Sequence, residues 1–152
     1  MQRIATILIL ISLAVIGYFT FLSQPEPAPE PVVRDDVTLR STRSGDVVGF
    51  IGRHGTRAWK GIPFAQPPTG KLRWRAPQPP SPWSGVREAL AAGDVCPQLK
   101  NPLSGGEGDP DRVSVGDEDC LYLNVWAPVN AANLPVMLWV HGGGNSIGDG
   151  GT

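Results

Sequence analysis

The sequence carries almost no net charge and contains no internal repeat. Its 152 residues have a formal net charge of −1 and a pI of about 6.1, which argues against a polyanionic partner such as nucleic acid. Basic residues dominate residues 34–87 and acidic residues dominate residues 88–152. We interpret these as two halves that neutralise each other in one fold, not as a nucleic-acid surface. The length allows one domain at most.

Cysteine and histidine are both scarce. Neither histidine lies at metal-ligand spacing from the two cysteines, Cys96 and Cys120, so we expect no metal site and no cofactor. The absence of any cysteine before Cys96 excludes a lipid-modified N-terminal cysteine. In an exported chain, an even number of cysteines at loop ends predicts a disulfide, here Cys96–Cys120.

Helix-forming sequence is also scarce, because 19 glycines and 16 prolines interrupt the chain. Short strand-like runs separated by turn signals predict a small antiparallel meander at residues 37–39, 47–51 and 58–60. Residues 121–127 predict a further strand, which Pro128 ends.

A proline-rich stretch at residues 61–74 cannot build a central strand or a helix. Because aromatic residues are interleaved with its prolines, we expect an ordered surface loop that buries Phe64, Leu72 and Trp74. A proline-rich recognition peptide is the competing interpretation.

The longest apolar run is residues 4–22. As a helix it would be roughly 28 Å long, about the thickness of a hydrocarbon core. A basic residue before it and acidic residues after it favour export of the rest of the chain. No clean Ala-x-Ala cleavage site is present, which favours an uncleaved membrane anchor over a removed signal peptide. We therefore expect an anchor or signal peptide at residues 1–22, a stiff Pro/Glu-rich linker at 23–36, and an extracytoplasmic or secreted domain at 37–152.

A second apolar run, residues 136–140, consists of strand-favouring residues and predicts a strand buried on both faces. It is followed by His141 and by three glycines, residues 142–144. Glycine permits positive φ and close approach of backbone, so successive N–H groups can converge on an anion. A His-Gly-Gly-Gly sequence after a strand is the oxyanion-loop pattern of lipases and esterases. A flexible glycine connection is the alternative.

Four segments together resemble the type-B carboxylesterase family, the cholinesterase-like α/β-hydrolases. Residues 118–128 are similar to the family's second signature, and three further segments match in order: residues 61–74, 82–86 and 141–144. The resemblance covers residues 37–148. It implies an α/β fold of which this chain is the N-terminal part, an antiparallel meander leading into the central mixed sheet.

The resemblance also assigns roles to individual residues. Gly143 and Gly144 would donate two oxyanion-hole N–H groups. The Cys96–Cys120 disulfide would close a loop near the active-site entrance, and Arg73 would pair with Glu118 at the base of that loop.

The family's catalytic serine, acid and histidine are expected outside this chain. Residues 144–148 fit Gly-x-Ser-x-Gly, but a nucleophile elbow needs a strand, a sharp turn and a helix, and the glycines that follow start a helix poorly. We therefore expect Ser146 not to be the nucleophile. The function implied is a serine carboxylic-ester hydrolase acting on a small-molecule ester, with these residues inactive alone. A catalytically inactive adhesion or binding domain is the alternative.

Overall fold

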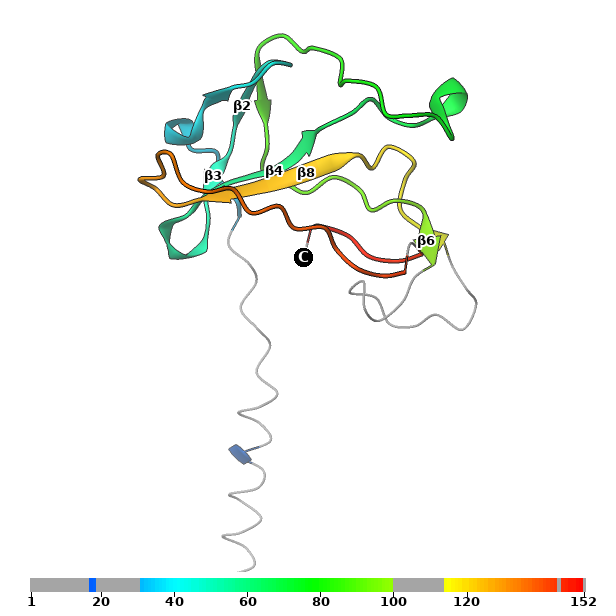
Figure 1. Cartoon of the computed structure of the whole chain (residues 1–152). Helices are drawn as coiled ribbons and strands as arrows, with labels where there is room; N and C mark the ends of the chain where they lie inside the picture. Colours follow the sequence, from blue (N-terminus) through cyan, green and yellow to red (C-terminus); the bar gives the residue numbers. More distant parts are fainter. Residues whose placement is uncertain (1–16, 19–30, 100–113, 145, 152) are drawn as a thin grey trace, which may run out of the picture. The chain divides into compact units, whose positions relative to one another are not determined.

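The computed structural model of the 152-residue chain describes residues 17–18, 31–99, 114–144 and 146–151 (Figure 1). Its contacts separate two units, Met1–Pro31 and Val32–Thr152. The run at residues 4–22 predicted as an anchor or signal peptide lies outside the described residues, except for Gly17 and Tyr18, which are helical. Among the described residues, no helix has both the length and the apolar character needed to cross a bilayer.

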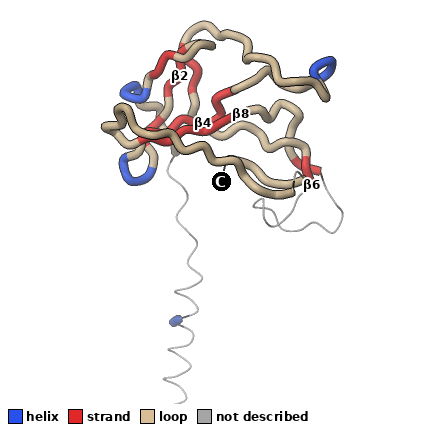
Figure 2. Tube along the Cα trace, in the orientation of Figure 1, coloured by secondary structure: helices blue, strands red, loops and turns tan. Residues whose placement is uncertain are grey.

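The second unit consists of short strands and turns joined by long loops (Figure 2). Its strands are β1 (Arg40–Ser41), β2 (Asp46–Val48), β3 (Phe50–Ile51), β4 (Arg57–Pro63), β5 (Val86–Glu88), β6 (Gln98–Leu99), β7 (Ser114–Val115) and β8 (Tyr122–Ala127). The 3-10 helices are η1 (Asp36–Thr38), η2 (Arg53–Gly55) and η3 (Gly70–Leu72).

The strands form mixed and antiparallel sheets. β3, β4 and β8 pair antiparallel in that order, and β4 and β8 lie side by side in Figure 1. β1 pairs antiparallel with β2, whereas β5 joins β2 in parallel, with Val47 opposite Arg87. β6 and β7 form a separate two-stranded ribbon. The predicted antiparallel pairing is present in the β3-β4-β8 sheet, but the parallel β5 was not predicted, because parallel strands need a long crossover that local sequence does not reveal.

The core is formed where β2, β4 and the end of β5 meet. Val47, Trp59 and Ala89 are buried there, with exposed fractions of 5% or less, and Ile62, Trp83 and Ala127 pack against them. Burying a large apolar side chain contributes roughly 1.5–3 kcal/mol. Gly49 lies so close to β4 that a Cβ there would fall on the carbonyl oxygen of Ala58. Only glycine therefore fits between β2 and β3 at this distance from β4.

The strand predicted at residues 37–39 is wrong, because these residues form η1 and its end. Asp35 Oδ1 accepts a hydrogen bond from Val37 N at 3.0 Å. The buried Thr38 hydroxyl donates to Asp35 O at 2.6 Å and accepts from Gly49 N at 2.7 Å. Local side-chain hydrogen bonds therefore override the alternating pattern.

The proline-rich loop that follows β4 buries Ala65 but leaves its aromatic side chains outside the core. Trp74 is 95% exposed and Phe64 is 48% exposed, so the prediction that this loop buries them is wrong; Leu72 is half-buried. β4 ends at Pro63, and the prolines that follow have no N–H to donate to a neighbouring strand. The chain therefore leaves the sheet before these side chains could join Trp59.

Residues 136–140 do not form the buried strand that their apolar run predicts. They carry no regular secondary structure, and their side chains are 76–95% exposed. The sheet strand that precedes them, β8, is paired with β4, and no described strand pairs with residues 136–140. An apolar run is buried only where other elements cover it, and none of the described elements does so.

Candidate active site

The glycine loop, which we define as the described residues 141–144 and 146–148, follows the apolar run and is closed by hydrogen bonds to one carbonyl. The carbonyl of Gly143 accepts hydrogen bonds from Ser146 N at 3.1 Å, Ile147 N at 3.3 Å and Ser146 Oγ at 3.1 Å. A single carbonyl therefore closes the turn.

Three described residues of the glycine loop have positive φ: 123° at Gly143, 61° at Gly144 and 116° at Gly148. A Cβ at Gly143 would fall on the carbonyl oxygen of Ile147, whereas a Cβ at Gly144 would meet nothing within 4 Å. Glycine at position 143 is thus required by both space and backbone conformation. At position 144 only the backbone conformation favours it.

The amides of Gly143 and Gly144 are candidate anion donors. Among the hydrogen bonds between described residues, none is donated by either N–H, and both residues are exposed. Gly143 lines a cavity of about 540 Å³ together with Trp126, Trp139 and His141, and Gly144 is the next residue in the chain. Consecutive backbone N–H groups at such a turn can hold an anion. That these two amides form an oxyanion hole stays a prediction.

Ser146 lies inside the turn, where its hydroxyl donates to Gly143 O. No strand is formed by residues 134–140 before it, and no helix by the described residues 146–151 that contain and follow it. A nucleophile elbow requires both. The geometry therefore differs from that of a nucleophile despite the matching sequence.

Two side-chain amides, which the sequence analysis did not single out, tie the end of the glycine loop to the sheets. Gln98 bonds both backbone groups of Gly148, and Asn124 on β8 donates to Gly150 O at 2.7 Å. Asn124 also accepts from Gly61 N at 2.9 Å. Single-sequence patterns carry no signal for such pairs, because the partners of Gln98 lie 50 residues away.

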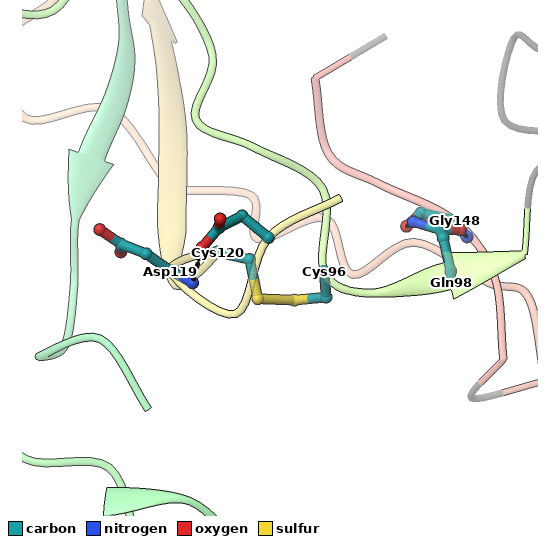
Figure 3. The surroundings of a disulfide bond; sticks show 6 residues. Cys96, Gln98, Asp119, Cys120 and Gly148 are labelled. Atoms are coloured by element: carbon teal, nitrogen blue, oxygen red, sulfur yellow. Dashed lines mark hydrogen bonds between the residues drawn. A yellow bond between two sulfur atoms is a disulfide. The ribbon is translucent and has the colours of Figure 1, made fainter. Parts of the chain in front are cut away.

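A disulfide joins Cys96 to Cys120 across 24 residues, with their Cα atoms 5.0 Å apart (Figure 3). Cys96 precedes β6 and Cys120 precedes β8. The bond therefore ties the β6–β7 ribbon to the sheet that contains β8.

Arg73 Nε lies 2.9 Å from Glu118 Oε1, and the two side chains are 53% and 39% exposed. Glu118 is two residues before Cys120, so the pair lies at the base of the disulfide loop. At this exposure, solvent screens the charges, and such an ion pair is worth under about 1 kcal/mol.

A second cavity of about 390 Å³ has a charged wall that includes Arg87, Asp119 and Tyr122. Burial and a hydrogen bond with Asp119 raise the pKa of Tyr122 above its ordinary value, although Arg87 opposes the shift. Tyr122 therefore stays protonated at neutral pH and does not act as a base there.

Comparison with known proteins adds to this geometry. The sequence profile of the Carboxylesterase family matches residues 36–152. The chain is 46% identical over 111 residues to para-nitrobenzyl esterase of Bacillus subtilis, a match that covers 72% of this chain and 22% of that protein. It is 43% identical over 117 residues to phenmedipham hydrolase of Pseudarthrobacter oxydans, covering 74% of this chain and 23% of that protein.

Comparison with solved structures also finds an esterase. PNB esterase matches with a TM-score of 0.64 at 44% identity, over 73% of this chain and 22% of that one. The chain spans about a fifth of the length of these relatives. PNB esterase is an α/β-hydrolase, and the mixed and antiparallel sheets described above are consistent with part of that fold. With its four ordered motifs, its glycine loop and a profile match over most of its length, the chain belongs to the type-B carboxylesterase family.

Proposed function

We propose that this chain supplies the oxyanion hole of a serine carboxylic-ester hydrolase that cleaves small-molecule esters. The observation that carries the proposal is the glycine loop, in which Gly143 and Gly144 are exposed residues with positive φ and Gly143 lines a cavity. The names of the relatives, among them an esterase and a hydrolase, support the reaction class. The nucleophilic serine, the acid and the histidine are proposed to lie outside these residues.

The loop has a defined task in this chemistry. Attack of a serine hydroxyl on an ester carbonyl breaks the C=O π bond and leaves a negative charge on its oxygen. The histidine takes the hydroxyl proton and later gives it to the departing alcohol, which leaves an acyl-enzyme that water hydrolyses. Backbone N–H groups already aimed at that oxygen stabilise the charge without reorganising. Gly143 and Gly144 are proposed as these donors.

The test uses the full-length protein that contains this sequence. It should hydrolyse a simple aryl ester such as p-nitrophenyl acetate, and a fluorophosphonate should abolish turnover by phosphonylating one serine. Peptide mapping should locate the modified serine outside residues 1–152. A fluorophosphonate adduct on Ser146 would overturn the proposal that the nucleophilic serine lies outside these residues. A folded protein without turnover or labelling would favour an inactive binding domain.

We further propose that the domain is exported, either tethered through residues 4–22 or secreted after their removal. The apolar run at the N-terminus and the Cys96–Cys120 disulfide support this, because disulfides persist in oxidising compartments. Protease added to intact cells should digest a tethered domain, whereas a secreted one should be found in the medium. Recovery of the domain only from lysed cells, with both thiols free, would contradict export.

A further inference from the structure

Gln98 makes a two-point contact with the glycine loop. Its side chain is 8% exposed. Nε2 donates to Gly148 O at 3.0 Å, and Oε1 accepts from Gly148 N at 2.6 Å. Figure 3 shows the Gln98 side chain against the Gly148 backbone. One buried amide thereby satisfies both backbone groups of one residue, as a neighbouring strand would.

Gln98 itself is held firmly. It lies on β6, where it pairs with Val115 of β7. It is also two residues from Cys96, which the disulfide ties to Cys120 at the start of β8. A covalent bond and a strand ladder thus fix the backbone from which the amide projects.

Gly148 is the point at which the glycine loop folds back on its own beginning. Its φ is 116°, and a Cβ there would meet Gly142 O and His141 Nδ1, each at 2.6 Å. One residue earlier, Ile147 donates to the carbonyl of Gly143. Gly148 therefore lies directly against the start of the glycine loop, one residue after the hydrogen bond that closes the turn at Gly143.

From these contacts we propose that Gln98 is a positioning residue for the oxyanion hole, an inference that rests on the proposed function. Gln98 touches no reacting atom. It acts through Gly148, and the disulfide gives it a rigid base. Asn124 provides a second attachment two residues farther along, at Gly150 O, so loss of Gln98 loosens the loop without releasing the whole segment.

Misplacement of catalytic groups by about 1 Å can cost up to about a hundredfold in rate. Gln98→Met keeps the side-chain volume close to that of glutamine but removes both hydrogen bonds. In the full-length protein it should lower kcat for p-nitrophenyl acetate by about 10- to 100-fold, with KM changed less than about threefold, because oxyanion donors act mainly in the transition state. Gln98→Glu, which keeps the acceptor for Gly148 N but loses the donor, should fall between Gln98→Met and the wild type.

Two further measurements separate positioning from general stability. Affinity for a trifluoromethyl ketone, whose serine adduct carries the same oxyanion, should fall by the same factor as kcat. Hydrogen–deuterium exchange of peptides covering residues 141–151 should accelerate. The matched control is Gln78→Met, because Gln78 is exposed and, among the described residues, its side chain donates only to nearby Ala76 O. This control should behave as wild type in every assay.

Faster exchange in Gln98→Met with kcat and inhibitor affinity within twofold of wild type would overturn the positioning role. Unchanged exchange would overturn the attachment itself. Absence of ester turnover in the wild type would instead refute the proposed function, and the exchange comparison would still decide whether Gln98 holds Gly148.

Discussion

Trp59 and Trp139 both stand in segments that the sequence predicts as strands, yet their environments are opposite. Trp59 lies in β4, is 5% exposed and donates through Nε1 to Thr38 O at 2.8 Å. Trp139 lies in the apolar run after β8 and is 82% exposed. Val48 and Val136 repeat the contrast, at 0% and 93%. The same residue types are core in one region and surface in the other, which shows that burial depends on the elements that surround a run.

The difference has a physical consequence for each region. The region around β2, β4 and β8 forms paired strands and a buried core within the described residues. Residues 136–140 present five consecutive exposed apolar side chains. Exposed apolar surface with unpaired backbone favours association with another chain.

The largest expected effect is therefore on association. Residues 32–152 expressed alone should form concentration-dependent oligomers, and Leu138→Lys should shift them to monomer. Val33→Lys is the control, because Val33 is 71% exposed but lies outside the run. Sedimentation velocity measures the change, and an equal effect of both lysines would show that the run is not the contact.

The next effect is on folding stability. In residues 32–152 carrying Leu138→Lys, Trp59→Ala should lower the free energy of unfolding by about 3–5 kcal/mol. It removes a core side chain and leaves Thr38 O without its donor. Trp139→Ala should change the free energy of unfolding by less than about 0.5 kcal/mol, as an exposed substitution does. Urea unfolding followed by circular dichroism measures the free energy of unfolding of both variants. Similar decreases in the two would show that Trp59 and Trp139 do not differ in their contribution to stability.

Gly49 and Gly143 give a second comparison between the two regions. Gly49 allows close packing of backbone, whereas Gly143 is proposed to act in catalysis. In the full-length enzyme, Gly143→Ala should lower kcat about 100- to 1,000-fold, or roughly 3–4 kcal/mol, because the added Cβ displaces the Ile147 carbonyl and turns the amide away. Gly144→Ala should also lower kcat, but less, since its Cβ meets nothing within 4 Å.

Gly142→Ala serves as the control for this series, because a Cβ there also meets nothing within 4 Å and its φ is not positive. It should leave kcat close to wild type. Steady-state kinetics on variants with unchanged circular dichroism provide the measurement. Near-normal kcat for a folded Gly143→Ala protein would exclude this residue from the oxyanion hole.

The smallest effect is expected at the Arg73–Glu118 pair, which is exposed and outside both regions. A double-mutant cycle of Arg73→Met and Glu118→Gln should give a coupling free energy under about 1 kcal/mol, reduced further in 1 M salt. Thermal unfolding of the four proteins measures it. A coupling of 3 kcal/mol or more would mean that the pair is buried in the full-length protein.

Much of the sheet could be predicted from sequence where the signal is local. Residues 121–127 are rich in strand-favouring residues and end at Pro128, and the structure has β8 at Tyr122–Ala127. The run at 47–51 was also recognised, although Gly49 divides it into β2 and β3. The parallel pairing of β5 with β2 could not be predicted, because the two strands are joined by a long crossover.

The candidate site likewise contains some residues that the sequence predicts and others that it does not. Its glycines are visible in the sequence, because few other residues tolerate positive φ or such close approach. Gln98 and Asn124 are not visible, because an amide side chain shows its role only through the backbone groups it meets.

By itself, the sequence determined the family, the strands around residues 47–51, 58–60 and 121–127, and the glycine turn, since each depends on residues that are neighbours in the chain. Only the tertiary structure decided that Trp59 is core while Trp139 and Trp74 are exposed, and that Gln98 reaches Gly148 across 50 residues. Burial and long-range hydrogen bonds belong to pairs of segments brought together by folding, and an apolar or amide residue considered alone does not specify its partner.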